Sequence, residues 1–429
     1  MISPGLANIV VIASLLVSLR AYVVVSKREG SYINILTPSF FVGVPAYYLL
    51  PLVYAKWFGT EATPYAYVYV YAALAVESVV FAYFYTRRST SVLRLPFSYA
   101  HDNFGWLGFA FLTLAVLLYV PVLLQFSDYI WDPRRIYEQT RTGFGTNFYI
   151  SSSLAYLAVI LILFSKRSIA VKVFVVVGSV LILSLHGSKG QVLSLLFLLV
   201  LFEVYVKGRK LRLMPALIVG AGLTIVGIAL FVATMVLGSP LEALESISQY
   251  SDYTRNAMLV IDSNIPRQYG RLTLESNIVS LIPRALMPSK PKNFGPMYLD
   301  EQFYPESLDE DAGSPAFGVG VQYADFGVFA IAYLAFFAAF RGWLAQIFVK
   351  RLKLTRHPAD FIVVAFLADI TLFPIGAGWL LPETIAVAIL IRYASCFGAD
   401  RVYRERIQPK VPTISSHALH RTDSAEGMA

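Results

Sequence analysis

Residues 214–237 read MPALIVGAGLTIVGIALFVATMVL and contain no charged side chain. A helix needs about 20 mostly apolar residues to cross a membrane, because lipid cannot hydrogen-bond to an exposed backbone. This run therefore predicts a transmembrane helix, and similar runs flank it on both sides. The sequence predicts an all-α polytopic integral membrane protein with about eleven such spans. They cover residues 4–25, 33–57, 65–86, 104–126, 148–164, 169–185, 191–206, 214–237, 316–340, 359–376 and 382–398.

The overall composition supports this class. Hydrophobic residues make up 57% of the chain and charged residues 14%, with a mean hydropathy of +0.62. Soluble proteins have roughly 45–50% hydrophobic and about 25% charged residues, so a soluble or disordered chain is excluded. The lone Cys396 excludes an internal disulfide and a cysteine-based metal centre. The five histidines are scattered along the chain without metal-ligand spacing. We therefore expect no metal and no cofactor.

The distribution of Lys and Arg predicts the orientation. Alternate loops hold 23 of these residues on one side and 10 on the other. Because cytoplasmic loops carry the excess, we expect a periplasmic N-terminus, a cytoplasmic C-terminus and a bacterial inner-membrane location. The basic side consists of 26–32, 87–103, 165–172, 207–213, 341–358 and the chain from 392. We expect residues 399–429 to form a disordered cytoplasmic tail.

Two periplasmic loops carry unusual charge. The long loop, 238–315, holds basic residues from 255 to 292 and acidic residues from 300 to 311, and the medium loop is 127–147. Membrane insertion tolerates basic residues in long loops, so their presence alone need not mean a site. The alternative is an anion site, because arginine binds phosphate oxygens bidentately. The common phosphorylated substrate on that side of the membrane is a lipid-linked sugar.

Four segments resemble elements of a known family. They are Asp132–Gly145, the turn His186–Gly190, the proline-framed Pro283–Pro291, and Gly318–Gly327 with the pattern Gly-x-Gly-x-x-Tyr-x-x-Phe-Gly. In order and spacing they resemble the O-antigen and oligosaccharide repeat-unit polymerases, over roughly 130–330. The hydropathy plan is similar over the whole chain.

The resemblance implies a polymerase that joins undecaprenyl-pyrophosphate-linked oligosaccharides at the periplasmic face into O-antigen, capsule or exopolysaccharide. It also implies a GT-C-like, metal-independent glycosyltransferase. The partners that it implies are membrane lipid and a chain-length-regulating membrane protein, and no nucleic acid. Two alternatives stay open. The related O-antigen ligases use a periplasmic histidine, and here only His186 lies outside. A lipid-linked oligosaccharide flippase or other transporter is the second.

Transfer of a sugar from a pyrophosphate needs cations for the leaving group and a base for the accepting hydroxyl. Outer aromatic rings can stack on sugars, although Tyr and Trp also favour the membrane interface in general. The candidate pyrophosphate-binding residues are Arg141, Lys189, Arg255, Arg284, Arg134, Arg135, Arg267, Arg271 and Lys290. The candidate bases are Glu275, Asp262 and Glu138, with Asp252 behind them, and the spacing does not choose among them. The candidate sugar-binding residues are Tyr137, Tyr253, Tyr269 and Tyr323.

Three carboxylates lie inside predicted spans, namely Glu77, Asp325 and Asp369. Ionisable groups at membrane depth are costly, so they either pair within the helix bundle or serve a function. Pairing is the structural interpretation. A proton-coupled transporter would also use such groups.

Overall fold

The computed structural model describes residues 3–57, 59, 62–87, 101–139, 144–232, 251–279, 282, 286–291, 293–308, 315–370, 372 and 382–396. The predicted tail over 399–429 lies outside these residues, as do Arg141 and Arg284.

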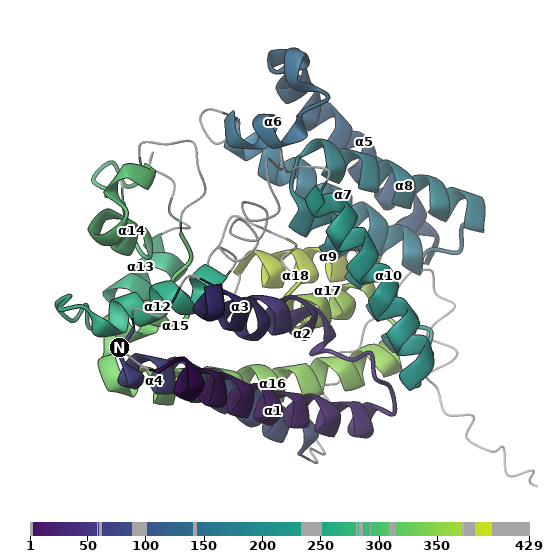
Figure 1. The fold of residues 1–429 in the computed structure, drawn as a ribbon. Helices are drawn as coiled ribbons and strands as arrows, with labels where there is room; N and C mark the ends of the chain where they lie inside the picture. The colour runs from purple at the N-terminus through teal and green to yellow at the C-terminus, as the bar shows by residue number, and fades with distance from the viewer. Residues whose placement is uncertain are drawn as a thin grey trace, which may run out of the picture.

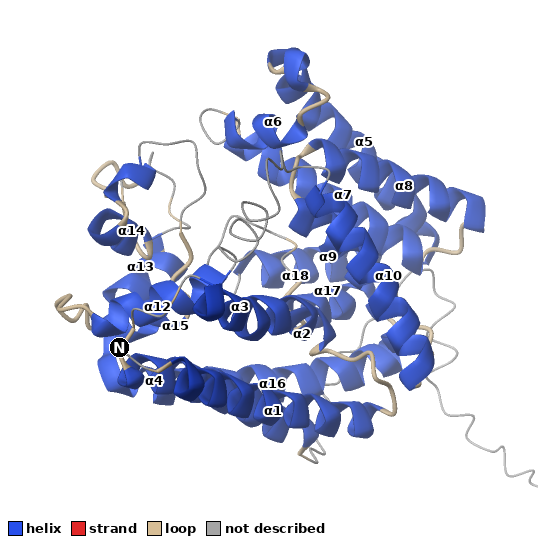
Figure 2. Cartoon of the chain, in the orientation of Figure 1, coloured by secondary structure: helices blue, strands red, loops and turns tan. Residues whose placement is uncertain are grey.

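The described residues form helices and loops, and none of them lies in a strand (Figure 2). This confirms the all-α prediction for the described part of the chain. The N-terminal helices are α1 (Pro4–Glu29), α2 (Thr37–Gly43), the π-helix η1 (Val44–Leu49), α3 (Leu50–Trp57), α4 (Pro64–Thr86) and α5 (His101–Gln125). Then follow η2 (Ser127–Tyr129), α6 (Pro133–Gln139), α7 (Gly145–Phe164), α8 (Ile169–Leu185), α9 (Lys189–Tyr205) and α10 (Leu213–Val232). The C-terminal part contains α12 (Asp252–Asp262), α13 (Arg271–Asn277), α14 (Met297–Phe303), η5 (Pro305–Leu308), α15 (Val319–Phe326), η6 (Gly327–Phe329), α16 (Ala330–Thr355), α17 (Pro358–Leu367) and α18 (Pro382–Cys396).

Helices α1, α4 and α16 lie side by side, with α4 in contact with both others (Figure 1). Small residues allow the close approach, as is common between membrane helices. A Cβ atom at Gly342 of α16 would lie 2.5 Å from the backbone oxygen of Phe81 on α4. Hydrogen bonds add to the packing: Ser14 donates to the backbone oxygen of Tyr71 at 2.7 Å.

A second group of helices is built around α5, α7 and α8, with α9 and α17 packed against α7. Helix α7 is the most enclosed of the long apolar helices in the described part, because most of its residues are buried. Its side chains therefore join those of α9 and α17 in the larger apolar core.

The long loop between α10 and α15 contains helices of its own. Helix α12 packs against α15 and the start of α4, and α13 packs against α15. Their apolar side chains share a core with the first turns of α1 and α4, through residues such as Val11, Val70, Met258 and Leu272. The described part of this loop is thus folded onto one end of the α1, α4 and α16 group (Figure 1).

The opposite end of that group carries basic residues. Lys353 at the end of α16 lies 2.6 Å from Glu29 at the end of α1. The hydroxyl of Tyr85, near the end of α4, donates to the same carboxylate at 2.6 Å. The three helices therefore point the same way along the group, as the predicted alternation of loops requires.

Among the described residues, six helices are long and apolar enough to cross a membrane: Gly5–Glu29, Thr37–Trp57, Pro64–Thr86, Asn103–Gln125, Gly145–Phe164 and Val319–Thr355. Five shorter apolar helices of the described part overlap the other predicted spans: Ile169–Leu185, Gly190–Tyr205, Leu213–Val226, Pro358–Leu367 and Thr384–Ala394. The segment 316–340 differs from the expectation. Gly327 ends α15, and α16 then continues to Thr355, through residues predicted to lie in a cytoplasmic loop.

A buried ionic cluster joins the last helices. Asp360 on α17 lies 2.8 Å from Arg351 on α16 and 2.8 Å from Arg392 on α18. Both Asp360 and Arg351 are nearly inaccessible, with 3% of each side chain exposed. The cluster fixes three helices to one another at this point.

We expect Asp360→Ala to lower the free energy of unfolding by about 3–5 kcal/mol, because it leaves two arginines without their buried counter-ion. Thermal unfolding of the purified protein in detergent measures this. Glu203→Gln, at a more exposed ion pair with Lys207, is the control and should change stability by about 1 kcal/mol or less. Equal melting temperatures for Asp360→Ala and the wild type would contradict the structural role.

Candidate functional site

Arg255 lies on α12 and faces the short helix α3. Its guanidinium sits 3.7 Å from the ring centre of Tyr54 and 3.3 Å from a carboxylate oxygen of Asp252. Burial raises the pKa of the Asp252 carboxyl, and the Arg255 charge opposes that rise. The predicted cation is therefore held between an aromatic ring and one carboxylate on the loop side of the bundle.

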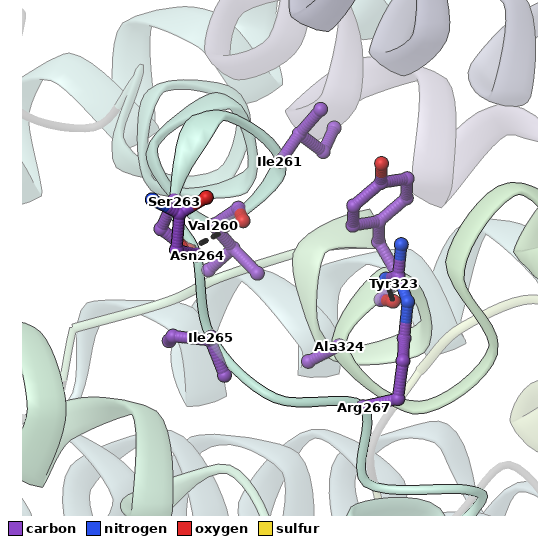
Figure 3. A pocket seen from close by; sticks show the side chains of 8 residues that line it. All are labelled: Val260, Ile261, Ser263, Asn264, Ile265, Arg267, Tyr323 and Ala324. Carbon is purple, nitrogen blue, oxygen red and sulfur yellow. Dashed lines mark hydrogen bonds between the residues drawn. The ribbon is translucent and has the colours of Figure 1, made fainter.

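Arg267 and Tyr323 lie together, although they are far apart in the sequence. The guanidinium donates to the backbone oxygen of Tyr323 at 2.7 Å and lies 4.6 Å from the centre of its ring. Both residues line a cavity of about 290 Å³ with residues from the end of α12, as Figure 3 shows. One predicted phosphate-binding residue and one predicted sugar-binding residue thus share a cavity.

The glycine-rich segment 318–327 explains how this cavity is built. A Cβ atom at Gly320 would lie 2.9 Å from the Cα of Ala257, so glycine lets α12 approach α15. A Cβ atom at Gly327 would lie 2.6 Å from the guanidinium carbon of Arg267. These glycines therefore make room for α12 and for the side chain of Arg267.

Arg271 and Glu275 form a pair on α13. The Nε of Arg271 donates to Glu275 at 2.8 Å, and this bond raises the pKa of Arg271. The second Glu275 oxygen accepts the backbone N–H of Gly295 at 2.7 Å. Glu275 thus connects α13 to the chain before α14, and both of its oxygens are engaged.

The other carboxylates of this region also hold the fold. Asp262 accepts the backbone N–H of Thr63 at 2.7 Å and its hydroxyl at 2.5 Å, at the start of α4. Asp325 is buried and accepts the backbone N–H groups of Leu272 and Thr273 at 3.0 and 2.7 Å. Asp325 therefore holds the first turn of α13 through hydrogen bonds from its backbone.

Lys290 is the remaining described cation of the long loop. It is buried, donates to the backbone oxygen of Ile282 at 3.0 Å, and lies 4.5 Å from the ring centre of Phe294. It holds the loop after residue 282 in place.

The medium loop packs against α5 and α7 instead. Arg135 lies 4.4 Å from the ring centre of Tyr129, and the ring of Tyr137 lies 5.7 Å from that of Phe148. The side chains of Arg134 and Glu138 on α6 and of Lys189 at the start of α9 lie outside the described part. Arg135 belongs to a different packing unit from Arg267.

His186 lies at the end of α8 and is completely buried. Its ring stacks on Tyr119 with centres 4.2 Å apart, and its nitrogens lie 2.7 and 3.2 Å from the backbone oxygens of Ile182 and Phe148. Burial lowers the pKa of His186 to about 4. A neutral imidazole can donate to only one of these two carbonyl oxygens, and the enclosed ring is suited to packing rather than to proton transfer.

The predicted sugar-binding tyrosines differ in exposure. Tyr269 is 87% exposed and has a φ of 52°. Tyr253 is 41% exposed, and its ring contacts Tyr47 on η1 at 5.4 Å. Tyr323 is buried behind Arg267. Of these, Tyr253 lines the larger cavity described next.

A cavity of about 630 Å³ lies among α2, η1, α4, α12, the start of α9 and α16. Its lining extends from Tyr253 and Gly190 to Glu77, Arg341 and Asp369. Arg341 pairs with Asp369, and its other nitrogen lies 3.9 Å from Glu77. Arg341 is the first residue of the predicted loop 341–358, and in the structure it lies within α16.

Among the described residues, no three His, Cys, Asp or Glu side chains gather as metal ligands. The charged lining of the larger cavity is instead one arginine and two carboxylates. These groups can bind hydroxyls and transfer a proton.

Comparison with known proteins gives two relatives of nearly full length. Each is an O-antigen polymerase, one from Salmonella typhimurium and one from Salmonella typhi. Each is 34% identical over 390 residues, which cover 90% of this chain and 94% of the relative. No family profile and no solved structure matches the chain.

Proposed function

The chain belongs to the O-antigen polymerase family, and we propose that it works at the periplasmic face. Its substrates in this proposal are oligosaccharide repeat units that are each linked to undecaprenyl pyrophosphate. As a member of that family it is a multi-pass protein of the bacterial inner membrane and a glycosyltransferase-type polymerase that makes O-antigen. The observation that carries this is the similarity over 90% of the chain.

We propose an orientation with a periplasmic N-terminus, a cytoplasmic C-terminus and about eleven spans in a GT-C-like arrangement. Six long and five shorter apolar helices support that count. The described helices of the long loop pack at one end of α1, α4 and α16, and the Glu29–Lys353 pair lies at the other. Because basic residues favour the cytoplasmic side, the loop helices belong to the periplasmic end in this proposal.

We propose that the outer basic residues bind the pyrophosphate of the donor. Arg267 and Arg255 are the best supported, since each lies beside aromatic rings in the folded long loop. Arg271 and Lys290 lie in the same folded loop. Arg141, Arg284, Arg134, Arg135 and Lys189 remain candidates from the other segments. A bound pyrophosphate gains charge as it leaves, and fixed cations stabilise it.

Transfer from a pyrophosphate-linked sugar needs no metal in this scheme, because the arginines and lysines neutralise the leaving group. A chain-length-regulating membrane protein is the partner we propose. The ligase alternative loses its support, because His186 is completely buried and its ring is stacked on Tyr119. The flippase alternative is not supported either, since the relatives are named polymerases.

Single substitutions test the pyrophosphate site. Arg267→Ala and Arg255→Ala are expected to lower polymer formation roughly ten- to hundredfold, because a hydrogen bond to a charged group contributes about 1.5–3 kcal/mol. Arg141→Ala and Arg284→Ala are expected to abolish long chains at an unchanged protein level. Polymer length is read from gels of the surface polysaccharide, and protein level from immunoblots.

Arg209→Ala is the matched control, because Arg209 pairs with Glu203 at the end of α9 that carries the basic residues. It should leave chain length unchanged. Normal polymer chain lengths in all four test variants would contradict the assignment of the pyrophosphate site.

A further inference from the structure

The larger cavity contains Glu77, the carboxylate of α4, which has no partner closer than 3.9 Å among the described charged groups. Glu77 makes no hydrogen bond to a described residue, and its nearest opposite charge is an Arg341 nitrogen at 3.9 Å. Asp369 differs, because one of its oxygens accepts from Arg341 and the other from Ser39. Glu77 therefore has lone pairs available to a molecule in the cavity.

The charges in the cavity favour a neutral, hydroxylated ligand. Among the described lining residues, Glu77 and Asp369 carry two negative charges and Arg341 one positive charge. Among these described residues acidic groups outnumber basic ones, which disfavours a pyrophosphate, while carboxylates accept hydrogen bonds from sugar hydroxyls. Ser39 and Ser78 add hydroxyls to the lining, and Tyr253 adds an aromatic ring.

The backbone around the cavity is irregular on two sides. The π-helix η1 contributes Tyr47 and Tyr48, and π-helical turns frequently occur at functional sites. Asp369 adopts a φ of 61°, in the left-handed region that a residue with a side chain seldom occupies. Such backbone persists where the surroundings hold it, often at active sites.

We propose that this cavity is the acceptor-sugar site and that Glu77 is the general base. The proposal rests on the polymerase function above. The accepting hydroxyl attacks the anomeric carbon of the donor sugar and gives its proton to Glu77. The bond from that carbon to the pyrophosphate oxygen breaks, and the oxygen keeps the electron pair. Water later takes the proton from Glu77. Arg341 and Asp369 are positioning residues, because their ion pair fixes the cation beside Glu77.

Two of the bases predicted from the sequence, Asp262 and Glu275, are occupied by structural hydrogen bonds. Asp262 and Glu275 each spend both oxygens on bonds that hold loop helices. A base must accept a proton from the substrate, so a carboxylate without such bonds is better suited.

The test uses the full-length protein. Its substrate is the lipid-linked repeat unit, extracted from a strain that lacks this protein. Glu77→Gln keeps the size of the side chain and removes the base. We expect kcat to fall about 10²- to 10⁴-fold with KM within about twofold, because general base catalysis contributes this much. Membrane level and melting temperature should match the wild type. The control is Glu203→Gln, far from the cavity, with an unchanged kcat.

A pH series separates catalysis from structure. The titratable groups facing Glu77 are Arg341, Asp369, Tyr47 and Tyr48. The wild-type rate should fall as acid protonates the base, and the residual rate of Glu77→Gln should lose that dependence. Arg341→Lys should retain more activity than Arg341→Ala, since it keeps the charge. Glu77→Asp, whose carboxylate is displaced, should turn over at least about tenfold more slowly but keep the acid limb.

Glu77→Gln that polymerises at the wild-type rate would overturn the inference. The polymerase function would still stand, because the wild type extends the same substrate in the same assay. A wild type that extends nothing would overturn the function itself. If Glu77→Gln does not reach the membrane, wild-type turnover by Glu77→Asp would overturn the inference.

Discussion

A strain that lacks this protein is expected to carry single O-antigen repeat units and no long polymer. The expectation follows from its membership in the polymerase family. Without the joining step, each repeat unit either stays on its lipid carrier or is attached alone. Extraction of lipid-linked saccharides and sizing of the surface polysaccharide measure this. Complementation with the intact gene should restore the long chains.

The same measurement separates the neighbouring activities. Full-length polymer accumulating on its lipid, unattached to any lipid A core, would indicate a ligase. Repeat units retained on the cytoplasmic face of the membrane would indicate a transporter. Either result would contradict polymerisation as the missing step.

Gly342→Ala is expected to have a large effect on folding. Its Cβ would lie 2.5 Å from the backbone oxygen of Phe81, and 3.2 Å from the backbone nitrogen of Tyr85. Backbone atoms cannot rotate away as a side chain can, so α4 and α16 would have to separate. Overpacking of a tight interface costs typically about 1–3 kcal/mol and more when backbone must move. We expect a loss of about 3 kcal/mol or more and a reduced amount of protein in the membrane.

Gly220→Ala is the matched control. Gly220 also lies within a helix, α10, but nothing lies within 4 Å of its Cβ position. Alanine is favoured over glycine in helices by up to about 1 kcal/mol, so this variant should be neutral or slightly more stable. Melting temperatures in detergent compare the two. A Gly342→Ala protein as stable as the wild type would refute the close packing of α4 on α16.

Most helices could be predicted from the sequence because uninterrupted apolar runs have few alternatives in a membrane. The run 65–86, for example, is α4 (Pro64–Thr86) in the structure. The end of the predicted span 316–340 differs from the end of α16 at Thr355. Arg341 follows an apolar run and reads as the start of a cytoplasmic loop. Only its contacts with Glu77 and Asp369 reveal that the helix continues around a paired charge.

The candidate site was predictable in its chemistry and less so in its arrangement. The pairing of Arg267 with Tyr323 joins residues 56 positions apart in the sequence, and no spacing rule foretells it. The roles of Asp262 and Glu275 as helix-holding carboxylates also depend on tertiary contacts. Glu77 and Asp369 were visible as costly charges inside spans. Their shared cavity with Tyr253 was not, because helices far apart in the sequence form it.

The most direct test of the central claim is a reaction with the purified protein and the lipid-linked repeat unit as its only substrate, in the presence of EDTA. We predict a ladder of products at multiples of the repeat unit, with one lipid pyrophosphate released for each unit joined. The ladder should be the same without EDTA. A substrate that stays at one repeat unit, with active protein confirmed by in vivo complementation, would contradict the account.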